Sequence, residues 1–179
     1  MAEPTVIHNT FVLERSYPVK PERVFAAFAD TAKKRRWFIE SDDDHAHTVE
    51  HYEMDFRVGG KETARVRLGP GTPVAGLACT NDITYLEIVP DRRIVFVSTM
   101  SIEDRCISAS LGTFELLPTG NGTDLIFTHQ AAFFEGSDGP AMRKEGWESM
   151  FARLTAELAG CSASQAKRIW AMHRTADTA

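Results

Sequence analysis

The sequence has 179 residues, of which 43% are hydrophobic and 25% are charged, and these values are typical of one globular domain with its own core. The net charge of −5 argues against nucleic acid and against an anionic membrane surface as partners, because both bind basic surfaces. No apolar run approaches the length that a membrane-spanning helix requires.

The first elements that the sequence predicts are one strand and one helix. Residues 6–17 alternate imperfectly between apolar and polar side chains, which indicates a strand. Pro21 suits the first turn of a helix, because the backbone N–H that proline lacks would have no partner there. The next residues have helical spacing, and their apolar side consists of Val24, Phe25 and Phe28.

A second short helix is predicted at residues 31–38, with Asp30 as its cap. Four consecutive basic residues, 33–36, precede Trp37 and Phe38. A phosphate site would require these bases to lie together, but consecutive side chains of a helix point in different directions. A solvated helix face is therefore the favoured interpretation of the basic run.

A polar loop rich in acidic residues and histidine follows at residues 41–47. Its candidate metal ligands are Asp42, Asp43, Asp44, His45 and His47, and His51 lies in the next strand. Two imidazoles and a carboxylate can bind zinc, whereas the alternating ligands and the glycine of a calcium loop are missing. We favour an exposed polar loop over a metal site, so no metal is predicted.

Six strands with short connections occupy the middle of the chain. Gly59-Gly60 predicts a tight hairpin turn between the first two of them. Strands joined by short turns are antiparallel, because a parallel crossover needs about a dozen residues or more. The predicted strands are residues 48–58, 61–68, 77–89, 92–102, 105–117 and 124–133.

An amphipathic helix is predicted at residues 138–158, where Asp138 can cap the first turn and Pro140 suits it. Gly146 lies in mid-helix, where glycine costs about 0.5–1 kcal/mol relative to alanine, so we expect a strand or a ligand to approach closely there. The apolar side consists of Met142, Trp147, Met150, Phe151, Leu154 and Leu158. The opposite side consists of Arg143, Lys144, Glu148, Arg153 and Glu157.

This order of elements predicts an α+β fold. An antiparallel sheet of about seven strands must cover one face, and only the two short helices and the long helix can do so. We expect the curved sheet to wrap around the long helix within a single domain, residues 1–159. Residues 160–179 are predicted to be a C-terminal extension with a short helix that contains Trp170.

Several short segments resemble a known family in both order and spacing. They are residues 21–25 (PERVF), 37–38 (WF), 55–60 (DFRVGG), 87–96 (EIVPDRRIVF), 122–125 (GTDL), 128–130 (THQ) and 146–147 (GW), with Leu154. From about residue 10 to residue 159 the chain resembles the activator of heat-shock protein 90 ATPase homologue-like branch of the START/Bet v I-type (SRPBCC) superfamily. The resemblance implies a helix-grip fold with a cavity between the sheet and the long helix. It implies no particular activity, since related folds bind lipids, hormones or polyketides, or act as cyclases and hydrolases.

His129 and Gln130 are the polar candidates for chemistry in such a cavity. They are neighbours in a predicted strand, so only one of them can face the cavity. A buried His129 could act as a general base near neutral pH, and Gln130 could orient a ligand through its amide. A hydrogen-bonded structural role is the favoured alternative for both. The sequence contains no G-x-S-x-G motif and no cysteine with a histidine nearby, so no nucleophile is predicted.

The leading hypothesis is a binding protein that holds an apolar or aromatic small molecule between the sheet and the long helix, without a cofactor. One alternative is an interaction module that acts on a chaperone ATPase, as the family resemblance suggests, through the basic run 33–36 and the Gly59-Gly60 hairpin. Another is a cyclase- or hydrolase-type enzyme that uses His129. The residues predicted to line the cavity are Trp37, Tyr52, Met54, Phe56, Phe96, Met100, Gln130, Trp147, Met150 and Phe151.

The location and the oligomeric state are predicted only in outline. Residues 1–10 contain no apolar signal core, and the widely spaced Cys79, Cys106 and Cys161 include no C-x-x-C pair. We therefore expect free thiols and a cytoplasmic protein. An antiparallel sheet with an exposed edge can pair with another copy, so both a monomer and a homodimer stay open.

Overall fold

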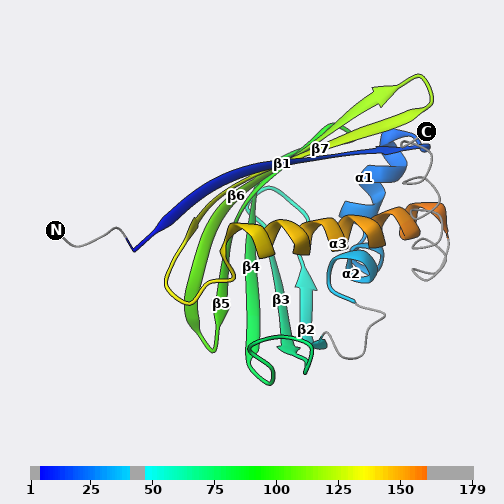
Figure 1. Cartoon of the computed structure of the whole chain (residues 1–179). Helices are drawn as coiled ribbons and strands as arrows, with labels where there is room; N and C mark the ends of the chain where they lie inside the picture. The colour runs from blue at the N-terminus through cyan, green and yellow to red at the C-terminus, as the bar shows by residue number, and fades with distance from the viewer. Residues whose placement is uncertain (1–4, 41–46, 161–179) are drawn as a thin grey trace, which may run out of the picture.

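The computed structural model describes residues 5–40 and 47–160. Its elements follow the predicted order of one strand, two helices, six strands and a long helix, so the α+β fold is confirmed (Figure 1). The elements are β1 (Ile7–Tyr17), α1 (Pro21–Ala29), α2 (Thr31–Phe38), β2 (His47–Met54), β3 (Lys61–Leu68), β4 (Ala78–Val89), β5 (Arg93–Ile102), β6 (Arg105–Thr119), β7 (Gly122–Phe133) and α3 (Gly139–Ala159).

Some sequence predictions lie outside these residues. The candidate metal ligands Asp42 to His45 and the extension from Cys161 onward belong to this group. Within the described ranges, no three histidine, cysteine or acidic side chains gather as metal ligands would. No helix in the same ranges is long and apolar enough to cross a membrane.

All seven strands form one antiparallel sheet with the order β1-β7-β6-β5-β4-β3-β2. The first strand therefore pairs with the last one, and β1 and β2 are the two edges. Figure 1 shows the sheet curving around α3, which crosses its concave face, with α1 and α2 beside one end of α3. This is the helix-grip arrangement, in which the long helix α3 covers the concave face of the sheet.

Aromatic rings join α3 to the sheet. The ring centroid of Phe127 in β7 is 4.3 Å from that of Trp147 and 5.6 Å from that of Phe151. Phe114 in β6 stacks on Phe127 with the ring centroids 4.5 Å apart. All four side chains are buried, and such ring pairs contribute about 0.5–1.5 kcal/mol each beyond the burial of apolar area. These contacts hold α3 over β6 and β7.

Gly112 makes room for one more ring of this cluster. Phe96 in β5 pairs with Gly112 in β6, and a Cβ atom at Gly112 would overlap the Phe96 ring. The same ring stacks on Phe114 with the centroids 5.6 Å apart. The glycine in β6 therefore has a packing role.

Gly146 has no such role. It lies on the exposed side of α3, and an added Cβ atom would meet no other atom within 4 Å. The prediction that a strand or a ligand approaches closely at Gly146 is therefore wrong. The glycine is a weak point of the helix that faces solvent.

Two local predictions also need correction. β2 ends at Met54, so residues 55–60 form a longer connection instead of a tight turn at Gly59-Gly60. Phe56 lies in this connection, where its ring contacts Tyr85. Asp138 makes no capping hydrogen bond through its side chain, because its carboxylate binds Arg143.

The basic run was predicted to be a solvated face, but Lys34 is buried with 4% of its surface exposed. Its Nζ lies 2.7 Å from Oε2 of Glu62, a residue of β3 that is fully buried. Tyr52 and Tyr85 also donate hydrogen bonds to the Glu62 carboxylate. Burial and this carboxylate raise the pKa of both tyrosines, so they stay protonated donors. The network connects α2 to the sheet.

We predict that Gly146→Ala stabilises the protein by about 0.5–1 kcal/mol, because alanine loses less backbone entropy on helix formation and the site has room for its methyl group. Urea unfolding followed by circular dichroism measures the change. Gly112→Ala is the matched control and should destabilise the protein, since its methyl group meets the Phe96 ring. A Gly146→Ala variant that is less stable than the wild type would contradict the placement of Gly146 in solvent.

We predict that Lys34→Met destabilises the protein by about 3–5 kcal/mol, because it leaves the Glu62 carboxylate buried without a cation. Adding Glu62→Gln to this variant should recover part of the loss, since the amide carries no charge. Chemical denaturation of the three proteins tests both statements. A loss below about 1 kcal/mol in Lys34→Met, the range of an exposed ion pair, would refute the buried pair.

Candidate functional site

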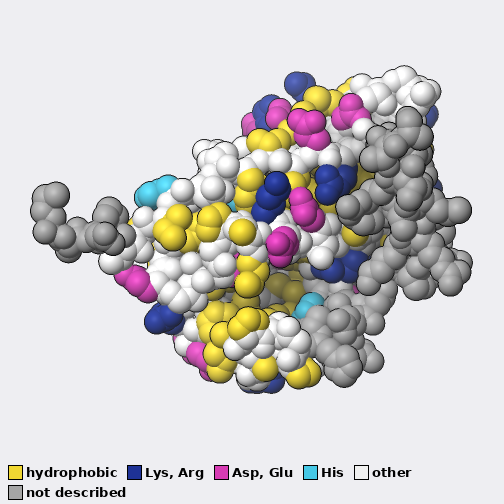
Figure 2. Space-filling model, in the orientation of Figure 1, with side chains coloured by type: hydrophobic (Ala, Val, Ile, Leu, Met, Phe, Trp, Pro, Cys, Tyr) yellow, Lys and Arg dark blue, Asp and Glu magenta, His cyan; other side chains and the backbone are white. Residues whose placement is uncertain are grey.

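A cavity of about 130 Å³ lies between α3 and the concave face of the sheet. Figure 2 shows hydrophobic side chains in the recess beside α3, on the face where α3 crosses the sheet. Its floor is formed by β3, β4, β5 and β7, and α2 closes one side. The lining residues are Phe38, Ile39, Ala64, Val66, Cys79, Asn81, Ser98, Met100, His129, Arg143, Trp147 and Met150.

The cavity exists because side-chain size changes along the concave face. On β6 and β7, large rings such as Phe114 and Phe127 support α3. On β3, β4 and β5 the floor carries short side chains, among them Ala64, Cys79 and Ser98. A straight helix that rests on the large rings cannot also contact the short side chains, so a space stays between them.

Arg143 brings a buried cation to this space, although its charge predicts a position on the polar side of the helix. Its side chain is 7% exposed and binds Asp138 in a bidentate pair with N–O distances of 2.8 and 2.7 Å. It also donates to Oγ of Ser108 at 2.9 Å and lies over the Phe133 ring at 5.2 Å. Arg143 is four residues before Trp147, so helical spacing places both side chains on the same side of α3. The charge of Arg143 favoured the opposite prediction.

His129 is the second buried polar group, with 2% of its surface exposed. Its ring stacks on Phe11 with the centroids 4.8 Å apart and lies 6.3 Å from Trp147. Nδ1 has no hydrogen-bond partner among the described residues. Burial, and then the nearby Arg143 guanidinium, lower the pKa of His129 to about 4, against a smaller opposing effect of Asp138. The imidazole is therefore neutral at pH 7.

Cys79 is a free thiol in the cavity floor. Burial raises its pKa, so the thiol stays protonated near neutral pH and behaves as a small hydrophobic group. Cys106 is also a free thiol and is exposed. The third cysteine lies outside the described residues.

The residues predicted to line the cavity occupy three places. Met100, Trp147 and Met150 do line it, together with His129. Gln130 points to the opposite face, because neighbouring residues of β7 alternate between faces. The others lie in the core or at its border, away from the cavity: Trp37, Tyr52, Met54, Phe56, Phe96 and Phe151.

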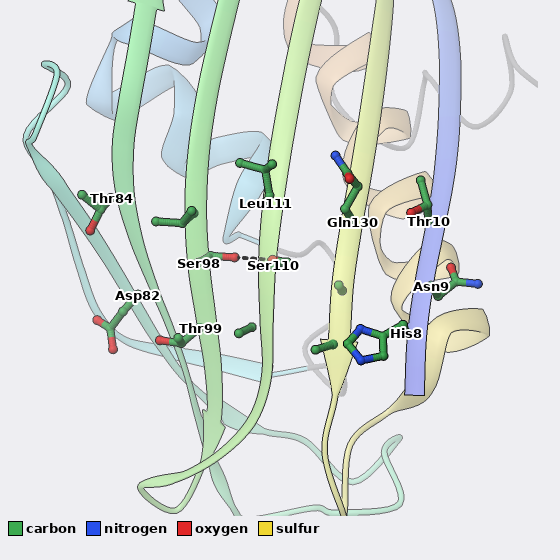
Figure 3. Close-up of a pocket in the computed structure, with 14 residues that line it drawn as sticks. His8, Asn9, Thr10, Asp82, Thr84, Ser98, Thr99, Ser110, Leu111 and Gln130 are labelled. Carbon is green, nitrogen blue, oxygen red and sulfur yellow. Dashed lines mark hydrogen bonds between the residues drawn. The ribbon is translucent and has the colours of Figure 1, made fainter. Parts of the chain in front are cut away.

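The opposite face of the sheet carries a wider depression of about 720 Å³, crossed by β1, β7, β6, β5 and β4 (Figure 3). Most of the side chains labelled in Figure 3 are polar, including Thr84, Thr99 and Gln130. None of the charged residues that line this depression is buried. The cavity beside α3 is smaller, but it holds a buried imidazole and a buried guanidinium, so we take it as the candidate site.

Comparison with known proteins identifies the fold family. Residues 18–159 match the family model described as activator of Hsp90 ATPase homolog 1-like protein. The chain belongs to this family. The match begins in the turn between β1 and α1 and ends with α3, so it includes every residue that lines the cavity.

Solved structures of similar sequence support this family assignment. A protein from Rhizobium loti is 44% identical with a TM-score of 0.74, over 86% of this chain and 99% of that chain. A protein from Rhizobium leguminosarum is 32% identical with a TM-score of 0.76, over 86% and 96% of the two chains. The AHSA1 protein from Silicibacter pomeroyi is 27% identical with a TM-score of 0.64, over 84% and 98%. A search of the curated proteins found no match.

We predict that His129 makes stability depend on pH between about 6.5 and about 4. In this window the unfolded state binds a proton that the folded state excludes, so stability falls as pH decreases. The expected loss is about 3 kcal/mol. Urea unfolding at several pH values should show that His129→Leu lacks this loss of stability at low pH, whereas Gln130→Leu retains it. Equal pH dependence in wild type and His129→Leu would contradict a buried neutral imidazole.

Proposed function

We propose that the protein binds a small, mainly apolar molecule in the cavity between the sheet and α3. The observation that carries this proposal is the cavity itself, in which an apolar lining surrounds a buried imidazole whose Nδ1 has no partner among the described residues. Ligand sites commonly combine an apolar wall with a few polar groups that orient the ligand. The combination is less expected in a core that serves only stability, because an unsatisfied buried group costs about 1–3 kcal/mol.

The volume supports a ligand the size of one aromatic ring. A cavity of about 150 Å³ can hold benzene, and the space beside α3 measures about 130 Å³. Met100 and Met150 are half-buried at its border, and unbranched methionine side chains adapt easily to the shape of a ligand. Larger ligands would require these side chains or α3 to move.

We predict that single-ring aromatic molecules bind saturably to the purified protein. Calorimetry with a panel of toluene, phenol and indole measures the affinity, and ¹H–¹⁵N NMR spectra should place the shifts at the lining residues. Ala64→Leu should weaken binding at least tenfold, because its larger side chain fills space in the cavity floor. Val97→Leu, on the outer face of β5, is the matched control and should bind as the wild type does. No saturable binding by any member of the panel would refute the proposal.

Action on a chaperone ATPase is the second candidate, and the family description supports it. The contact points predicted for it are only partly available in this chain. Lys34 is buried against Glu62, and Arg35 and Arg36 form ion pairs with other residues of this chain. An ATPase assay with the purified chaperone separates this candidate from ligand binding.

A cyclase or hydrolase role for His129 has weaker support. With a pKa of about 4 the imidazole is a weak base at pH 7. No described residue binds its Nδ1, so the ring lacks the partner that orients a catalytic histidine. The same histidine suits ligand binding, where a neutral group that offers one hydrogen bond is sufficient.

A further inference from the structure

We propose that the ligand is a neutral aromatic molecule with one hydroxyl group, a phenol, whose hydroxyl forms a hydrogen bond with His129. This inference rests on the proposed function and specifies the chemistry of its ligand. It excludes two other classes that the same cavity volume would admit, aromatic hydrocarbons without a polar group and aromatic acids. Three features of the site favour the phenol.

The first feature is the hydrogen-bonding capacity of His129. The ring lines the cavity, is 2% exposed and has no partner at Nδ1 among the described residues. A neutral imidazole has one N–H donor and one acceptor nitrogen, and either can be at Nδ1. A hydroxyl group can donate or accept, so it can pair with a ring nitrogen of His129 in either tautomer. A hydrocarbon offers the imidazole no hydrogen bond.

The second feature is the charge balance of the site. Arg143, His129 and Cys79 are the titratable groups among the lining residues. The Arg143 guanidinium already binds both oxygens of Asp138, so its charge has a counterion within the same helix region. The imidazole and the thiol are neutral at pH 7. A carboxylate in the cavity would therefore be desolvated without a free cation to balance it, which is strongly unfavourable.

The third feature is the arrangement of groups that can contact an aromatic ring. Phe38 and Trp147 both line the cavity, with their ring centroids 6.0 Å apart. Met100 and Met150 add thioether groups, which make favourable contacts with ring edges. A ligand ring beside Trp147 would also lie near His129, since the imidazole and indole centroids are 6.3 Å apart. The aromatic ring of the ligand can therefore contact Trp147 while its hydroxyl group forms a hydrogen bond with His129.

Calorimetry with phenol, toluene and benzoate at pH 7 tests the inference. We expect phenol to bind at least tenfold more tightly than toluene, and benzoate to bind more weakly than both. In His129→Leu the affinity for phenol should fall to that for toluene, because the hydroxyl loses its partner. Gln130→Leu, one residue away on the opposite face, should keep the preference for phenol.

Each outcome has a distinct meaning. Equal binding of phenol and toluene, or strongest binding of benzoate, would overturn this inference while ligand binding itself stands. Absence of binding by all three compounds would refute the proposed function as well. If His129→Leu does not fold, ¹⁵N NMR of the wild-type imidazole replaces it: the ring-nitrogen resonances should shift with phenol and not with toluene. Ring-nitrogen resonances that phenol leaves unchanged would overturn the inference.

Discussion

The contact between α3 and the rings of β6 and β7 determines most of this structure. Trp147 and Phe151 rest on Phe127, which in turn stacks on Phe114. The height of these rings sets the distance between the helix and the sheet. Where the sheet carries short side chains instead, on β3 to β5, the same distance leaves a cavity. Core packing and the candidate site therefore have one cause.

The buried pair of Lys34 and Glu62 has a different role in the same fold. It connects α2 to β3 at 2.7 Å, at the end of the concave face where Tyr52 and Tyr85 also bind the carboxylate. Buried ion pairs contribute little net stability compared with well-packed apolar residues, because both charges lose their hydration. Their geometric requirement is strict, however. We infer that the network fixes the position of α2, whose Phe38 closes one side of the cavity.

The sequence predicted the fold more completely than the site. Strand alternation and short turns determine an antiparallel sheet, and β3 and α2 were predicted with their observed bounds. The cavity depends on which residues face one another across elements, and periodicity along one element cannot show this. Lys34 and Arg143 were assigned to solvent because charged residues are usually exposed, yet distant residues supply Glu62 and Ser108 as partners. Gly146 marks no close contact, because a residue that is rare in helices does not imply a neighbour.

The position of the counterion of Arg143 bears on how such a cavity can select a ligand. An arginine that lacks a protein counterion attracts anions, because the ligand then supplies the missing charge. Here Asp138 precedes Arg143 by five residues and binds it in a bidentate pair before any ligand enters. Burial, and then the guanidinium, lower the pKa of His129 and keep it neutral, while Asp138 balances the charge of Arg143. A buried cation with a local counterion thus gives the cavity a polar wall that favours hydrogen-bonding groups over charged ones.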